Sequence, residues 1–138
     1  MNEVIAMDQW SVLVVESDNA IRATVVEGLR DCGLVVEGTG AADVSIELWR
    51  GDVIVTDTFA SPYSTEAVAA YLDELRSRFA AGLVVLTGHD GAAVDAAQLP
   101  ADAVVMKPFD LDDLIEVIDT VARERRDRDE RNRRPIAS

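Results

Sequence analysis

Five short runs of apolar, mostly β-branched residues recur along the chain, and they constrain its fold more than any other feature. The runs lie at residues 12–15, 34–36, 53–55, 83–86 and 103–106. Each is apolar throughout, whereas a strand with one solvent-facing side alternates apolar and polar residues. Strands buried on both faces, as in parallel sheets, have this continuous pattern. We therefore expect five buried parallel strands.

The segments between and after these runs show helical periodicity, with apolar residues three or four positions apart. The stripes are Ile21, Val25 and Leu29; Val44 and Leu48; Val68, Tyr71, Leu72, Leu75 and Phe79; an alanine-rich fourth segment at 92–99; and Leu111, Leu114, Ile115, Ile118 and Val121 after the expected cap Asp110. Parallel strands need right-handed crossovers. The order therefore predicts an α/β fold of five βα units, an open doubly wound parallel sheet with helices on both faces.

Charge and hydropathy exclude several partners. The formal net charge is −13, and seven of the thirteen basic residues lie between Arg123 and Arg134. Binding to a nucleic-acid backbone requires basic groups that replace counterions, so we expect no nucleic-acid partner. No run of eighteen apolar residues could span a bilayer, and residues 1–10 carry acids where a signal peptide begins with basic residues. We therefore expect no membrane association and a cytoplasmic location.

The chain of 138 residues is long enough for one core, and we expect one domain over residues 11–122 after a lead-in at 1–10. Residues 123–138 lack an apolar face, and we expect a frayed, arginine-rich tail with no output domain after it. The single cysteine, Cys32, has no disulfide partner, so we assign it to the core, and we expect Trp10 and Trp49 to be packing residues.

Polar residues that suit phosphate chemistry stand at the carboxyl ends of the expected strands. Glu16 follows the first, Asp57 the third, Thr87 ends the fourth, and Lys107, the only lysine, follows the fifth. In an open α/β sheet the ligand crevice lies at these ends. Mg²⁺ takes one or two carboxylates together with water and phosphate oxygens. We expect Asp57 to be the nucleophile and Lys107 a point charge, with Pro108 a candidate for a cis peptide.

The same residues carry a family resemblance. Residues 12–16, 53–57 and 83–87 and the Lys107-Pro108-Phe109 triplet resemble the motifs of bacterial response-regulator receiver domains, in order and spacing, across residues 11–121. The resemblance implies a flavodoxin-like (βα)5 fold with strand order 2-1-3-4-5. It also implies Mg²⁺-dependent phosphorylation of Asp57 by a histidine kinase or phosphotransfer protein, with Thr87 and Lys107 contacting the phosphoryl group.

Two departures from the receiver pattern bear on the metal. Receivers carry two adjacent acids after the first strand, but Glu16 is followed here by Ser17, with Asp18 one place late. We expect Glu16, Asp57 and the backbone carbonyl of Phe59 to be the ligands, assisted by Ser17 through a water or by Asp18. Because Ser17 supplies no charge, the substitution predicts weaker Mg²⁺ affinity.

A third departure concerns the switch. The aromatic residue that receivers place three positions before the lysine is Val104 here, so the usual aromatic switch is missing. In having Gly88 directly after Thr87, the chain resembles single-domain alphaproteobacterial receivers with altered switch regions. In those proteins, rearrangement of the loops and of the fourth helix replaces aromatic flipping.

The leading hypothesis is a stand-alone receiver without enzymatic turnover, phosphorylated at Asp57, that signals to a downstream protein through its fourth helix, fifth strand and fifth helix. The alternative is a pseudo-receiver, an interaction module without metal or phosphate chemistry.

A dehalogenase-like phosphohydrolase is disfavoured, because Phe59 stands where that family needs a second acid. A dinucleotide site at 38–43 is disfavoured because Asp43 would oppose a pyrophosphate, and His89 is expected to be a surface residue. The sequence leaves open the kinase, the target, dimerisation, and whether the chain signals by protein contact or passes phosphoryl groups onward.

Overall fold

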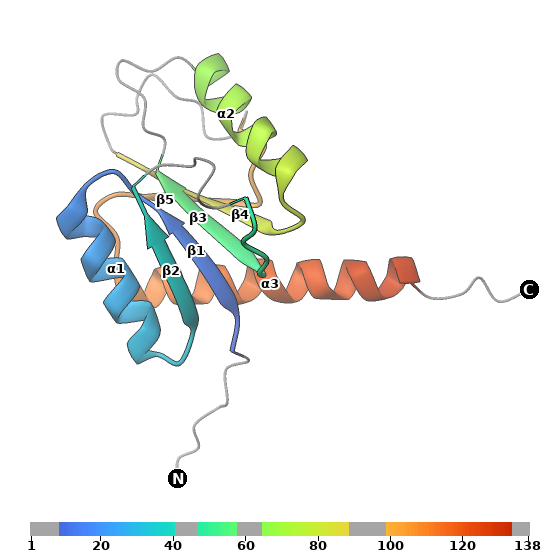
Figure 1. Ribbon diagram of the computed structural model, residues 1–138, viewed down its shortest axis with the longest axis horizontal. Coiled ribbons are helices and arrows are strands. Elements are labelled where there is room, and N and C mark those ends of the chain that lie inside the picture. Colours follow the sequence, from blue (N-terminus) through green and yellow to red (C-terminus); the bar gives the residue numbers. More distant parts are fainter. Residues whose placement is uncertain (1–8, 41–46, 58–64, 89–98, 134–138) are drawn as a thin grey trace, which may run out of the picture.

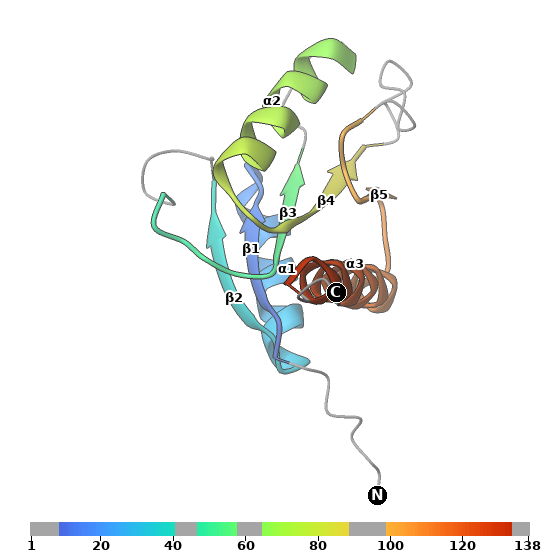
Figure 2. The ribbon, with the colours of Figure 1, turned by 90° about the vertical axis from the view of Figure 1, so that its right-hand side faces the viewer.

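The computed structural model describes residues 9–40, 47–57, 65–88 and 99–133, and they form a parallel sheet with helices on both faces (Figures 1 and 2). The five strands stand in the order β2-β1-β3-β4-β5, which confirms the expected fold. The strands are β1 (Ser11–Val15), β2 (Val35–Thr39), β3 (Val53–Asp57), β4 (Gly82–Thr87) and β5 (Ala103–Met106). The helices are α1 (Asn19–Asp31), α2 (Thr65–Arg78) and α3 (Leu111–Arg133).

The continuous apolar pattern of the central strands β1, β3 and β4 arises because the sheet is covered on both sides. The expectation of five buried strands is wrong for the edge strands β2 and β5, where Val35 and Met106 are 54% and 53% exposed. Val12 and Val14 of β1 pack with α1 and α3 on one face, whereas Leu13 and Val15 pack with α2 on the other. All four side chains are at most 1% exposed. Burying one such side chain completely stabilises the fold by about 1.5–3 kcal/mol. A polar residue on either face of β1 would therefore lose this contribution.

Helix α1 has an aspartate cap at its start and a glycine in a left-handed conformation after its end. Asp18 caps its start, because its Oδ1 accepts a hydrogen bond from the amide of Ile21 at 2.9 Å. The helix ends at Asp31 with Cys32 as its C-cap, and Gly33 follows with φ of 93°, a left-handed conformation that favours glycine. The assignment of Cys32 to the core is wrong, since its side chain is exposed at this helix end.

Two of the five expected helices fall largely outside the described residues, at 41–46 and 89–98. Leu48, expected on the inner face of the second helix, lies in a turn and is 88% exposed. The expectation for Leu48 is therefore wrong. The neighbouring Trp49 does pack, with its ring 6.0 Å from the ring of Phe79 in an edge-on arrangement, and Leu99 is buried on the α2 face.

Helix α3 continues through the arginine-rich segment to Arg133, where a frayed tail was expected (Figure 1). Asp119 accepts hydrogen bonds from the indole of buried Trp10 and from Arg123, both at 2.9 Å. The guanidinium of Arg126 stacks 4.8 Å from the Trp10 ring centroid. These contacts stabilise charged turns that lack an apolar stripe of their own. Within the described residues, no helix is both long and apolar enough to cross a membrane.

Candidate functional site

Glu16, Asp57, Thr87 and Lys107 lie at the carboxyl ends of β1, β3, β4 and β5. The backbone holds them there, because the amide of Glu16 donates to Thr39 O at 3.0 Å and the amide of Lys107 donates to Thr87 O at 2.7 Å. Asp57 is the last residue of β3 and pairs in register with Leu86 of β4. Glu16, Asp57 and Thr87 therefore leave strands with a neighbouring strand on both sides, whereas Lys107 leaves the edge strand β5, which pairs with β4 alone.

Lys107 joins the two carboxylates of the site. Its Nζ lies 2.9 Å from Glu16 Oε1 and 3.5 Å from Asp57 Oδ1. The Glu16 side chain is 1% exposed, whereas Asp57 and Lys107 are 15% and 21% exposed. The Lys107–Pro108 peptide is cis, as considered from the sequence. Glu16 is therefore the buried carboxylate of the site, while Asp57 is partly exposed to the crevice.

The environment of Glu16 disfavours its charge. Burial raises the pKa of the Glu16 carboxyl above its usual value of 4.5, and the neighbouring Asp57 carboxylate acts in the same direction. Hydrogen bonds from Lys107 and from the amide of Asp18 oppose this rise without cancelling it. The backbone oxygen of Glu16 also accepts from Arg22 at 2.7 Å, which fixes the residue at its strand end.

Ser17 and Asp18 have different roles. The hydroxyl of Ser17 donates to Asp57 Oδ2 at 3.2 Å, so it contacts the candidate nucleophile directly. The carboxylate of Asp18 instead caps α1. Asp57 therefore has a cation beside one oxygen and a hydroxyl donor beside the other.

A buried polar chain behind Asp57 was not foreseen from the sequence. Thr56 Oγ1 donates to the backbone oxygen of Asp57 at 2.8 Å and lies 2.8 Å from the hydroxyl of Tyr71 on α2. Burial raises the pKa of Tyr71 to about 12, so it stays a neutral donor. The available signal was Thr56 itself, since a threonine in an otherwise apolar buried strand needs a hydrogen-bond partner.

Comparison with known proteins decides what kind of fold carries this site. No protein-family model matches the chain. The DNA-binding transcriptional regulator NtrC of Azospirillum brasilense is 29% identical over 121 residues, covering 82% of this chain and 24% of that protein. The chain thus spans about a quarter of the length of this curated relative.

Solved structures of receiver domains superpose on most of the chain. They include FixJ-N, at 24% identity and TM-score 0.66 over 85% of this chain and 96% of that chain. The signal receiver domain of a putative Luxo repressor protein from Vibrio parahaemolyticus has 17% identity and TM-score 0.69, over 88% and 95%. NtrX from Brucella abortus has 23% identity and TM-score 0.73, over 94% and 31%. This chain has the fold of a response-regulator receiver domain.

The receiver fold allows the metal expectation to be tested against the donors present. In the described part of the chain, no group of three or more acidic, histidine or cysteine side chains could hold a metal ion. The two carboxylates, Glu16 and Asp57, still suit Mg²⁺, which takes one or two carboxylates and completes its shell with water. The carbonyl of Phe59 lies outside the described residues. The donor set therefore fits Mg²⁺ with fewer charges than an adjacent acid pair would supply.

Thr87 and Val104 are two further positions that the receiver pattern singles out. Thr87 is 5% exposed, and its hydroxyl makes a long hydrogen bond of 3.4 Å to Gly88 O. Val104, at the position where receivers carry an aromatic, pairs with Val85 in register and packs half-buried on the α2 face. The described site thus places the Thr87 hydroxyl at the strand end and has no aromatic ring at position 104.

Proposed function

We propose that this chain is a receiver of a two-component system that accepts a phosphoryl group on Asp57 from a histidine kinase or phosphotransfer protein. The observation that carries the proposal is the position of Asp57, a partly exposed carboxylate that has the only lysine of the chain 3.5 Å from one oxygen. Phosphoryl transfer depends mainly on such positioning and charge neutralisation. The 29% identity to NtrC and the receiver fold support the same proposal.

In the transfer, a carboxylate oxygen of Asp57 forms a bond to phosphorus while the phosphorus–nitrogen bond of the donor histidine breaks. Lys107 donates to one phosphoryl oxygen, because its ammonium already lies beside Asp57. Thr87 donates to another after a rotation of its hydroxyl away from Gly88 O, where its present hydrogen bond is long. The donor histidine keeps the electron pair of the broken bond and takes up a proton.

Magnesium, when bound, neutralises charge that develops on the phosphoryl oxygens. We propose that the carboxylates of Glu16 and Asp57 hold it, with the Phe59 carbonyl and a water on Ser17 or Asp18 as further ligands. The Glu16 carboxylate that would hold the metal now lies 2.9 Å from Lys107 Nζ, and the Lys107 ammonium would serve the phosphoryl group.

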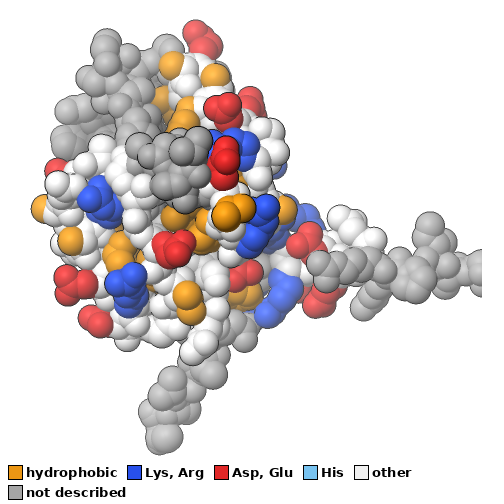
Figure 3. Space-filling model, viewed as in Figure 1, with side chains coloured by type: hydrophobic (Ala, Val, Ile, Leu, Met, Phe, Trp, Pro, Cys, Tyr) orange, Lys and Arg blue, Asp and Glu red, His pale blue; other side chains and the backbone are white. Residues whose placement is uncertain are grey.

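An apolar groove beside the site offers a contact surface for a protein partner. It has a volume of about 480 Å³ and lies between α1 and the start of α3. Its lining includes Ala20, Ile21 and Leu111 together with residues 107–109. On the face shown in Figure 3, the described acidic and basic side chains are interspersed and form no continuous basic surface. We propose that both phosphodonor and target are proteins and that signalling occurs by protein contact.

The pseudo-receiver remains a second candidate because of one observation. Lys107 and Ser17 together pair both oxygens of Asp57 with groups of the protein itself. A constitutive interaction module would retain such a closed network. The two functions differ in whether Asp57 binds a phosphoryl mimic.

Beryllium fluoride with Mg²⁺ forms a tetrahedral phosphoryl mimic on reactive aspartates, and amide NMR shifts report it. We expect shifts at Thr87 and Lys107 in the native protein and none in Asp57→Asn. An Asp73→Asn variant, changed at an exposed position on α2, serves as the charge-matched control and should respond like the native protein. A folded native protein that shows no shift would favour the pseudo-receiver.

A further inference from the structure

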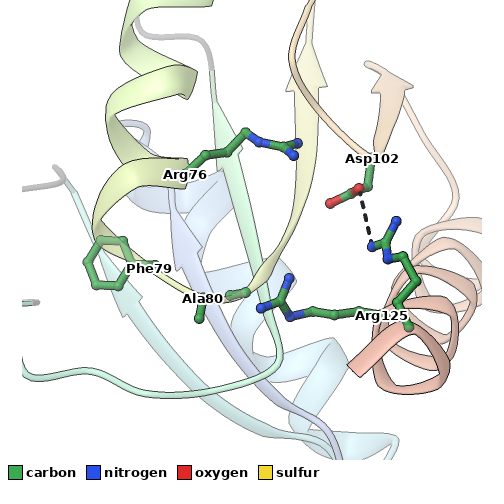
Figure 4. Close-up of a pocket in the computed structure, with 7 residues that line it drawn as sticks. Arg76, Phe79, Ala80, Asp102 and Arg125 are labelled. Atoms are coloured by element: carbon green, nitrogen blue, oxygen red, sulfur yellow. Dashed lines mark ion pairs between the residues drawn. The ribbon is translucent and has the colours of Figure 1, made fainter. Parts of the chain in front are cut away.

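A second polar hollow lies at the amino ends of β4 and β5, at the opposite end of the strands from Asp57 (Figure 4). Its volume is about 390 Å³. Arg76 projects toward it from α2, and Arg125 and Arg128 reach it from α3. Asp102 and residues 79–81 complete the wall. Two helices far apart in the sequence, α2 and α3, therefore place three guanidinium groups around one space.

The charge of this hollow is opposite to that of the chain. Three guanidinium groups and one carboxylate line it, which leaves an excess of two positive charges (three minus one), whereas the whole chain carries −13. The backbone already uses the carboxylate, because Asp102 Oδ2 accepts from the amide of Leu83 at 2.8 Å. Its other oxygen lies 4.0 Å from Arg128, the ion pair drawn in Figure 4. Asp102 therefore compensates the arginines only in part.

The remaining arginines have unused donors. Arg76 reaches the backbone oxygen of Pro100 at a long 3.4 Å. Arg125 is half-buried and, among the described residues, makes no hydrogen bond or ion pair. Partial burial of an unpaired cation is unfavourable, and neighbouring cations repel one another. An anion between them would offset both costs.

We propose that this hollow binds a small phosphorylated molecule through a phosphate monoester group. The planar guanidinium fork donates two parallel hydrogen bonds to phosphate oxygens, and two excess positive charges match a dianionic monoester. The volume falls in the range of about 300–1,000 Å³ for small-molecule sites, so room remains for the body of the ligand. The bound anion ties the C-terminal turn of α2 to the extension of α3. None of these residues takes part in the proposed chemistry at Asp57.

The test titrates the full chain with inorganic phosphate and with ribose 5-phosphate, in metal-free buffer at fixed ionic strength, and follows amide NMR shifts. We expect saturable shifts at Ala81 and Asp102 with both probes, and tighter binding of ribose 5-phosphate. Arg125→Gln should weaken binding by about tenfold or more, as for loss of a charge-assisted hydrogen bond. Arg76→Gln should act in the same direction. Asp102→Asn should tighten binding, because it removes the competing carboxylate.

The matched control is Arg131→Gln, which removes the same charge from an exposed position of α3 outside the hollow. It should change affinity by less than about twofold at moderate salt. Equal weakening by Arg125→Gln and Arg131→Gln would identify an adventitious ion only and overturn the proposal. Shifts confined to Thr87 and Lys107 would place the phosphate at the Asp57 site and overturn it equally.

Discussion

At the scale of single residues, Ser17 sets the character of the site. Its hydroxyl donates to Asp57 Oδ2 at a position where the receiver pattern has a second acid. A carboxylate there would repel Asp57 without a metal and would bind the metal when it is present. The serine is therefore expected to lower Mg²⁺ affinity, and it gives Asp57 Oδ2 a hydrogen-bond donor from the protein itself.

Ser17→Asp should raise Mg²⁺ affinity by roughly tenfold, because each added carboxylate strengthens binding of a hard cation. The same change should lower stability in metal-free buffer through repulsion with Asp57. Mg²⁺ titration followed by NMR, with urea unfolding in EDTA, measures both effects. Ser17→Asn, which adds volume without charge, is the control. Unchanged Mg²⁺ affinity in Ser17→Asp would show that position 17 lies outside the metal shell.

Glu16 gives a pH prediction whose sign follows from its raised pKa. The folded protein holds a proton on Glu16 at pH values where the unfolded chain, with a pKa near 4.5, has released it. The contribution of Glu16 to the free energy of unfolding is therefore highest below pH 4.5 and falls as the pH rises through the folded-state pKa.

In metal-free urea unfolding, native protein should accordingly lose stability relative to Glu16→Gln as the pH rises above 4.5. Glu37→Gln, at an exposed position of β2, should follow the native pH profile. Parallel profiles for the native protein and Glu16→Gln would contradict the burial and coupling assigned to Glu16.

At the scale of elements, the contact between α1 and α3 depends on a glycine inside a helix. A Cβ added to Gly28 would overlap the Leu111 side chain at the start of α3. This close approach places Phe109 and Lys107 beside α1, where they line the apolar groove. The helix accepts the unfavourable propensity of glycine because the neighbouring helix needs the space.

Gly28→Ala should therefore destabilise the protein by up to about 2 kcal/mol, since the propensity gain of about 1 kcal/mol offsets part of an overpacking cost of about 1–3 kcal/mol. Urea unfolding of Gly28→Ala, Leu111→Ala and the double variant measures the coupling. The double variant should be more stable than the sum of the two single effects predicts. Additive effects would show that the two residues do not compete for space.

At the scale of the whole molecule, the fold could be predicted because each strand contains a short apolar run and helical periodicity follows each run in the sequence. The strand ends then identified Glu16, Asp57, Thr87 and Lys107 as neighbours. Local pattern could not reveal where apolar residues are exposed. Leu48 continues an apolar spacing but lies in a turn, and Cys32 lies at a helix end.

Long-range contacts account for the other differences. The arginine-rich segment has no apolar stripe, yet it extends α3. It is stabilised by Trp10, more than a hundred positions away in the sequence, because Arg126 stacks on the Trp10 ring and Asp119 accepts a hydrogen bond from its indole. Tyr71 supports Asp57 through Thr56, but periodicity alone assigns it to an apolar helix face. Such partners become visible only once the chain is folded.

The most direct measurement of the central claim is intact-mass analysis after incubation with acetyl phosphate, with and without Mg²⁺, for native protein, Asp57→Asn and the control Asp73→Asn. We expect a gain of one phosphoryl group in native protein and in Asp73→Asn, dependent on Mg²⁺, and none in Asp57→Asn. Absence of any gain in folded native protein at saturating Mg²⁺, or an equal gain in Asp57→Asn, would contradict phosphorylation at Asp57.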